Sequence, residues 1–237
     1  MNVPPWNGGF HPNLAAFLGL PVVSPDNYES IASEFEAQDP AQYLPDGADA
    51  TVIAGYEAQK AALASAMRSP DVTFYQQMIG GSPSGSVQNL RPVSRGTVLI
   101  NPSNPEAEPI VDDRAMSNPI DNAVMVEHIK FFRRYMTTGE LAQYQAQEIS
   151  PGSGVSTDEQ LGQWARQQTS PSVFHPCGTA AKMPQEQGGV VNEDLLVHGV
   201  ENLSVVDASI FPTLVGGTIS MTVYAVAEKV SNPSLPI

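Results

Sequence analysis

Three strand-like runs separated by short turns constrain the fold of this chain more than any other feature. The first, residues 72–79 (VTFYQQMI), is rich in β-branched and aromatic residues and ends at the turn-rich stretch GGSPSGS. The second and third runs are residues 87–93 (VQNLRPV) and 95–101 (RGTVLIN). Runs of this kind, with turn residues between them, are typical of antiparallel strands. We therefore expect an antiparallel sheet in this part of the chain.

Helical patterns lie on both sides of the expected sheet. Residues 49–69 begin with an aspartate, contain many strong helix formers and carry basic residues late, which predicts a helix. Residues 120–135 place apolar side chains close to a helical repeat, which predicts a second one. A shorter helix is expected at 137–149, and a capping box from Ser156 to Glu159 indicates the start of another.

The two ends of the chain have different patterns. Residues 1–47 contain seven prolines among small and polar residues, so we expect an irregular segment without long regular elements. Residues 202–209 (NLSVVDAS) form a compact apolar run, which predicts a buried strand. Gly216 and Gly217 then precede a final helix that is expected to extend through Val230. The order of helix, sheet, helices, strand and helix indicates an α+β fold.

The composition excludes several kinds of partner and site. The chain of 237 residues has a net charge of −14, which repels nucleic-acid phosphates and favours a neutral small molecule or another protein as partner. Its single cysteine excludes an internal disulfide and any site with several thiolate ligands. No apolar run approaches the roughly 18 residues of a membrane span, and the first residues lack the pattern of a signal peptide. We therefore expect a cytoplasmic protein that binds neither nucleic acid nor membrane.

The stretch VFHPCGTAA, residues 173–181, contains a candidate catalytic histidine. His175 is two residues from Cys177, with Pro176 between them and Gly178 after them. Because a turn does not place the two side chains on one face of a strand or helix, we interpret Cys177 as a small buried thiol rather than a nucleophile. Pro176 favours an extended backbone at His175, so a rigid histidine at a strand end could be a general acid or base. A hydrogen-bonded loop histidine is the alternative.

The histidines do not form a metal-binding pattern. His11, His128, His175 and His198 show no HxxxH spacing among them. We therefore expect no metal site. We interpret His11, His128 and His198 as structural residues.

The last candidate site combines a strand, a turn and a helix start. In residues 205–230 (VVDASIFPTLVGGTISMTVYAVAEKV), the expected strand leads to Asp207, and Gly216 and Gly217 precede a helix start rich in hydroxyl groups. Free amides at a helix N-terminus, approached closely past glycines, can bind an electron-rich ligand group. Ordinary glycine-assisted capping is the alternative.

Four collinear stretches, between about residue 42 and residue 230, resemble the C-terminal half of the glucose–methanol–choline (GMC) oxidoreductases. They are RPVSRGTVLINPSNPEAEPIVDDRAMSNPIDNAVMVEHIKFFRRYMTT, FHPCGTAAKM, GGVVNEDLLVHGVENLSVVDASIFPT and GGTISMTVYAVAEKV. The aryl-alcohol oxidases and related fungal biosynthetic enzymes look most similar. Members of this family depend on FAD and oxidise alcohols by passing a hydride to the flavin, while a histidine takes the hydroxyl proton.

The resemblance implies a role for each candidate residue. His175 is the expected base, with Thr218 as its neighbour in the catalytic site. The residues expected beside the ribityl chain and isoalloxazine ring are Asp207, Ala208, Gly217, Thr218, Ile219 and Ser220. The substrate is expected to be a small molecule.

The resemblance also divides the chain into three parts. Residues 1–47 are an irregular proline-rich segment. Residues 48–172 are expected to form the GMC substrate-binding domain, an antiparallel sheet backed by helices. Residues 173–237 correspond to the end of the flavin domain, with a residual strand and the C-terminal helix.

Two departures from the family pattern bear on the cofactor and on the chemistry. The family opens with a Rossmann unit whose G-x-G-x-x-G turn holds the FAD pyrophosphate, and this sequence contains no such turn before a helix. FAD binding is therefore expected only with a complementary FAD-binding chain, and none by the isolated chain. Thr218 stands where the family usually has histidine or asparagine, and a threonine hydroxyl cannot act as a base near neutral pH.

The sequence leaves three functions open. The first is the substrate-binding, base-carrying part of an FAD-dependent oxidoreductase that acts on CH–OH groups and is completed by an FAD-binding chain. The second is an FAD-independent cyclase or isomerase that uses His175 and Thr218 for proton-transfer or pericyclic chemistry in fungal natural-product biosynthesis. The third is a non-catalytic binding or assembly subunit. We expect exposed apolar surface to be covered by the N-terminal segment, a homodimer partner or a second chain.

Overall fold

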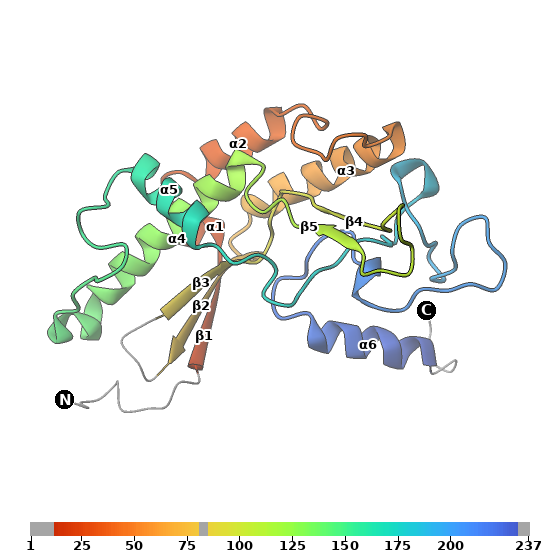
Figure 1. Ribbon diagram of the computed structural model, residues 1–237. Helices are drawn as coiled ribbons and strands as arrows, with labels where there is room; N and C mark the ends of the chain where they lie inside the picture. The colour runs from red at the N-terminus through yellow and green to blue at the C-terminus, as the bar shows by residue number, and fades with distance from the viewer. Residues whose placement is uncertain (1–11, 81–84, 232–237) are drawn as a thin grey trace.

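Strand β2 (Thr73–Gly80) is the centre of a three-stranded antiparallel sheet with the order β1-β2-β3 (Figure 1). It pairs with β1 (Pro12–Gly19) on one side and with β3 (Gly85–Asn89) on the other. Antiparallel pairing of the first two predicted runs is therefore confirmed. The computed structural model describes residues 12–80 and 85–231, so the tip of the connecting turn and His11 lie outside the described residues.

The third predicted run pairs with a different strand. Strand β4 (Thr97–Leu99) forms a separate two-stranded antiparallel sheet with β5 (Ile110–Asp112). Between β3 and β4, the Arg91 amide donates to the Asn89 side chain, Pro92 has no amide hydrogen, and the amides of Val93 and Ser94 donate to the Asp121 carboxylate at 2.8 Å each. The connection between the two sheets is therefore hydrogen-bonded to helix α4 (Pro119–Met136).

The two long predicted helices are confirmed. Helix α3 (Ala50–Met67) starts at Asp49, whose carboxylate accepts the amides of Thr51 and Val52. Helix α4 (Pro119–Met136) starts at Asn118, whose side chain accepts the amide of Ile120. Both caps satisfy amides that the first turn of a helix leaves without partners.

The segment after α4 differs in detail from the prediction. In place of a helix at 137–149 there is a short 3-10 helix, η1 (Gly139–Tyr144). Helix α5 (Asp158–Gln168) starts with a capping box between Thr157 and Gln160, one residue later than the predicted pair Ser156 and Glu159. The Gln160 amide donates to the Thr157 hydroxyl oxygen at 3.3 Å.

The expectation of an irregular segment without long regular elements at residues 1–47 is wrong for its described part. That part contains β1, the short helix α1 (Leu20–Val23) and the ten-residue helix α2 (Tyr28–Ala37). Two of its described prolines lie at the start of an element, where a missing amide hydrogen breaks no hydrogen bond. Pro12 begins β1, and Pro21 lies in the first turn of α1.

The buried strand predicted at residues 202–209 is also wrong. This segment contains only an isolated bridge between Ser204 and Leu196, followed by the 3-10 helix η3 (Ala208–Ile210). The Val205 amide donates a hydrogen bond to the Leu195 carbonyl, at 3.1 Å, and Leu195 lies in a loop and not in a strand. The final predicted helix is confirmed as α6 (Ser220–Ser231).

The largest hydrophobic core lies where α2, α3 and α4 pack against the start of β2. Its fully buried side chains include Phe35, Met67, Phe74 and Ile120. A second core cluster, which we call the C-terminal cluster, joins Val191, Ile210, Phe211 and Ile219 with the residues packed around them. The mixed helix and antiparallel sheet architecture confirms the predicted α+β class.

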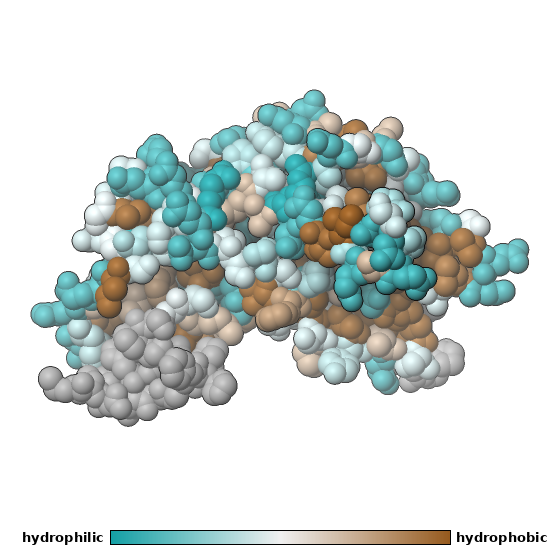
Figure 2. Space-filling model, viewed as in Figure 1, coloured by the Kyte–Doolittle hydropathy of each residue, from teal (hydrophilic) through white to brown (hydrophobic). Residues whose placement is uncertain are grey.

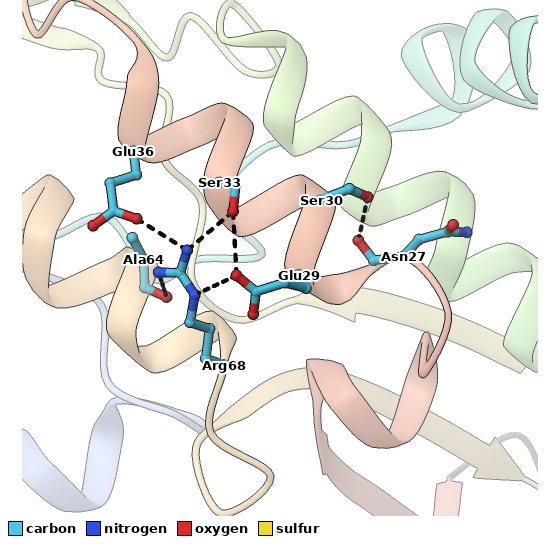
Figure 3. A network of polar contacts seen from close by, with 7 residues as sticks. All are labelled: Asn27, Glu29, Ser30, Ser33, Glu36, Ala64 and Arg68. Carbon is cyan, nitrogen blue, oxygen red and sulfur yellow. Dashed lines mark hydrogen bonds and ion pairs between the residues drawn. The ribbon is translucent and has the colours of Figure 1, made fainter.

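Polar contacts on the surface join α2 to α3 (Figure 3). Arg68, at the end of α3, donates to Glu29 and Glu36 at 2.9 Å each and to Ser33 at 3.2 Å. The Arg68 hydrogen bond lowers the pKa of the Glu29 carboxyl. Because these groups are exposed, water and salt weaken the contribution of the network to stability.

Two surface regions expose large apolar side chains (Figure 2). One covers the β4–β5 hairpin, with Val98, Leu99, Ile100, Ile110 and Val111 exposed. The other lies along α6, where Met221, Tyr224 and Val230 are exposed. Exposed apolar surface is therefore present in two separate regions of the described chain.

Candidate functional site

His175 lies in an irregular loop after α5 and not at the end of a strand, so that part of the prediction is wrong. The three preceding residues, Ser172, Val173 and Phe174, have positive φ angles of 71°, 46° and 60°. A left-handed backbone at side chains with a Cβ costs roughly 1–3 kcal/mol per residue. The His175 amide closes this turn by donating to the Ser172 carbonyl at 2.9 Å and to the Ser172 hydroxyl at 3.1 Å. This turn precedes the half-buried His175, whereas the predicted turn was the one after it, toward Gly178, which has a φ of 87°.

Cys177 is partly buried against the C-terminal cluster. Burial raises the pKa of its thiol, and the positive charge of Arg95 opposes that rise. A raised pKa keeps the thiol protonated and therefore weakly nucleophilic. Within the described residues, no hydrogen bond joins Cys177 to His175, which supports the interpretation of Cys177 as a packing residue.

The segment that follows His175 lies beside the segment expected to contact the flavin. Three backbone amides donate to three carbonyls across the two segments: Gly178 to Ala208 (3.4 Å), Ala180 to Ser209 (2.9 Å) and Lys182 to Ile210 (2.8 Å). The structure thus places two of the predicted site segments side by side.

Asp207 and Ala208 occupy the start of η3. The Asp207 carboxylate accepts the Ser209 amide at 2.8 Å and the Ser209 hydroxyl at 2.5 Å. Asp207 is exposed, whereas Ala208 is half-buried and packs against the C-terminal cluster. The Asp207 carboxylate therefore caps the start of η3 and remains exposed to solvent.

The remaining predicted site residues lie just before and at the start of α6. Thr218 and Ser220 are exposed, and Ile219 is buried in the C-terminal cluster together with the partly buried Cys177. Cys177 and Ile219 therefore pack in the same hydrophobic cluster. Within the described residues, no hydrogen bond joins His175 to Thr218.

The surroundings of Gly217 fit a bound group. A Cβ added to Gly217 would meet only Phe17 Cε1, at an ordinary contact distance of 3.8 Å. No contact within the described residues therefore requires glycine there, and the space beside it is open. The amides of the first α6 turn lack partners within their own helix. These features suit an electron-rich atom of a ligand placed against the helix start, whereas the sequence contains no glycine-rich turn before a helix for a pyrophosphate.

Two arginines that the sequence analysis did not single out make long-range contacts, and one of them, Arg91, reaches the segment before α6. Arg95 donates to Gln59 at 2.9 Å and lies over the Tyr56 ring, 5.3 Å from its centroid. Arg91 donates to the Leu214 carbonyl at 3.3 Å. Both arginines belong to the RPVSRG stretch, which was part of the family resemblance. The contact from Arg91 to Leu214 could not be predicted, because the two residues are more than 100 positions apart and no local sequence pattern indicates such a contact.

The two best-defined pockets in the described part of the chain contain neither His175 nor Thr218. The first, of about 340 Å³, is lined by Ser24, Pro25, Asp26, Asn27, Glu127, Lys130 and Arg134. The second, of about 260 Å³, lies beside β4 and β5. Asp207, Ala208 and residues 217–220 also line neither of these pockets.

Residues 12–80 and 85–231 contain neither a cluster of metal-ligating side chains nor a helix that could span a membrane. There, His, Cys, Asp and Glu side chains form no group of three or more that could hold a metal ion. None of the described helices combines the length and hydropathy that crossing a membrane requires.

The arrangement of sheet, helices and C-terminal segment is that of a known oxidoreductase family. The family model described as GMC oxidoreductase matches residues 92–227. The chain belongs to the GMC oxidoreductase family.

Individual relatives are much longer than this chain. The dehydrogenase xptC of Emericella nidulans is 33% identical over 205 residues, covering 86% of this chain and 33% of the relative. An FAD-dependent oxidoreductase from Chaetomium thermophilum superposes with a TM-score of 0.88 at 33% identity, covering 92% of this chain and 37% of that one. A fungal aryl-alcohol oxidase gives a TM-score of 0.87 at 37% identity with the same coverage. The chain thus spans about a third of the length of these proteins.

Proposed function

We propose that the chain is the substrate-binding and base-carrying part of an FAD-dependent oxidoreductase that acts on CH–OH groups, and that an FAD-binding chain completes it. One observation carries the proposal. Large apolar side chains that adjoin the candidate residues in the sequence are exposed within the described part of the chain. Phe174, directly before His175, is 98% exposed, and Met221 and Tyr224, which follow Ser220 on α6, are 75% and 73% exposed. Exposed aromatic and aliphatic side chains of this size are typical of an interface.

The residues of this chain would have separate roles in that reaction. When bound, FAD supplies a hydride acceptor for the carbon of the CH–OH group. His175 takes the hydroxyl proton on an unprotonated ring nitrogen. General-base catalysis of this kind typically accelerates a reaction by about 10²–10⁴-fold. Thr218 donates or accepts a hydrogen bond at the substrate oxygen but does not take the proton. The strained turn at residues 172–174 holds His175 at the edge of the site.

Co-expression tests this proposal directly. The FAD-binding part of the fungal aryl-alcohol oxidase, which the chain resembles, serves as the complementary chain. We expect a purified complex with visible flavin absorbance that is bleached by an alcohol substrate. His175→Ala should keep the flavin absorbance and slow the bleaching by at least about 10²-fold. If neither this nor any other complementary chain retains flavin with the protein, the proposal is wrong.

A second candidate function is an FAD-independent cyclase or isomerase that uses His175 for proton transfer. It is favoured by Thr218, which stands at the position of the usual second base and leaves only one base in the site. Thr218→His separates the two functions. In the flavin complex it should accelerate alcohol oxidation, whereas in a flavin-free isomerase it should bring no oxidation. Turnover by the isolated, flavin-free chain would favour the second candidate.

A further inference from the structure

Hydrogen bonds from the three-stranded sheet hold the backbone that leads into α6. Thr73, the first residue of β2, donates its hydroxyl to the Gly216 carbonyl at 2.7 Å. Arg91, just after β3, donates to the Leu214 carbonyl at 3.3 Å and to the Thr73 carbonyl at 3.1 Å. One arginine therefore bridges β2 and residues 214–216, which are more than 100 residues away in the sequence.

Gly216 is required for this arrangement. A Cβ at Gly216 would overlap the Thr73 hydroxyl and would lie 3.2 Å from Arg91 Nη2. Only glycine lets the backbone approach both donors, whereas Gly217 has open space beside it. The two adjacent glycines consequently serve different purposes: Gly216 faces the sheet, and Gly217 faces the site.

Arg91 is itself held in place from α4. Its amide donates to the Asn89 side chain at 3.1 Å, and Asn89 donates to the Asp121 carboxylate at 3.2 Å. Burial lowers the pKa of Arg91, but an arginine stays protonated in proteins, so its bonds to carbonyls are charge-assisted. A chain of hydrogen bonds thus runs from the buried Asp121 to the Leu214 carbonyl.

We propose that Arg91 and Thr73 are positioning residues that fix the 214–217 backbone and thereby set where Thr218 and the start of α6 lie. The two residues act through the Leu214 and Gly216 carbonyls. The segment that they hold runs from η3 into α6 (Figure 1). The catalytic consequence rests on the proposed function, whereas the tethering of the backbone does not.

The tethering is tested in the chain alone by NMR relaxation. In Arg91→Gln and Thr73→Val, we expect the Gly216 and Gly217 amide order parameters to fall from the rigid range of about 0.85 toward values below about 0.6. Arg91→Lys and Thr73→Ser keep a donor and should restore part of the rigidity. Arg166→Gln is the matched control, because Arg166 also donates to a backbone carbonyl, that of Met116 at 3.1 Å, at another site. Unchanged order parameters in both Arg91→Gln and Thr73→Val would overturn the proposal.

The catalytic consequence is tested in the complex with the FAD-binding chain. We expect Arg91→Gln to lower kcat by roughly tenfold or more, since a lost charge-assisted bond has about that effect on an equilibrium, with a smaller change in KM. Arg91→Lys should recover part of kcat, and Arg166→Gln should leave it unchanged. A flexible segment with an unaltered kcat would overturn the positioning role. Absence of a flavin complex with the unsubstituted chain would instead refute the proposed function, and the tethering would then be judged by the order parameters.

Discussion

Replacement of His128 by leucine should remove a large part of the chain's sensitivity to acid. His128 lies on α4, is 0% exposed and packs edge-on against Tyr75, with ring centroids 5.0 Å apart. Neither ring nitrogen has a hydrogen-bond partner within the described residues. Burial lowers the pKa of His128 from 6.5 to about 3. The folded protein therefore keeps this ring neutral at pH values where the unfolded chain protonates it.

The sign and size of the effect follow from that difference in pKa. Because the folded-state pKa is lowered, the contribution to stability is complete above about pH 6.5 and is lost progressively as the pH falls toward 3. At pH 5 the loss is about 2 kcal/mol, since 1.5 pH units correspond to about 1.4 kcal/mol each. Leucine has no titrating group, so His128→Leu should lack this loss. Its cost near neutral pH should be below about 1.5 kcal/mol, because the volume is similar and two unpartnered nitrogens are removed.

Urea unfolding at about pH 7.5 and about pH 5 measures the effect. The unsubstituted chain should lose about 2 kcal/mol more than His128→Leu between the two pH values. Tyr75→Phe is the matched control: it removes a hydroxyl that donates to Gln77 at 2.5 Å, so it should reduce stability equally at both pH values. Losses that agree within about 0.5 kcal/mol between the unsubstituted chain and His128→Leu would refute the assignment of His128 as a buried neutral ring.

Three further substitutions test the packing and the helix ends. Gly55→Ala should destabilise the chain by about 1–3 kcal/mol in denaturant unfolding, because its Cβ would overlap the Gln187 carbonyl where α3 packs against η2 (Gln185–Gln187); an unchanged midpoint would contradict this contact. Thr157→Ala should cost about 1 kcal/mol through loss of the α5 capping box, and Thr157→Ser should cost much less. Arg68→Ala should lower the melting temperature by at most about 4 °C, and 0.5 M salt should shrink the difference, as an exposed ion-pair network requires. A salt-independent effect of Arg68→Ala would indicate lost packing instead.

The elements with strong local signals could be predicted from the sequence. Asp49 and Asn118 are side-chain caps, and each precedes a long helical pattern, so α3 and α4 were found close to their observed bounds. The start of α6 was found because Gly216 and Gly217 mark a break before a helical pattern. The turn at residues 172–175, which precedes Pro176, was not predicted. The family itself was visible because its motifs are local and collinear.

The tertiary structure alone decided features that depend on distant partners. Residues 202–209 are as apolar as a buried strand, but their amides pair with a loop and not with a neighbouring strand. The Asp121 carboxylate accepts the Val93 and Ser94 amides, and Arg91 donates to the Leu214 carbonyl across the fold. Local sequence sets the preference of a short segment for helix, strand or turn. The hydrogen bonds that the segment finally makes also depend on groups that are distant in the sequence and that only folding brings near.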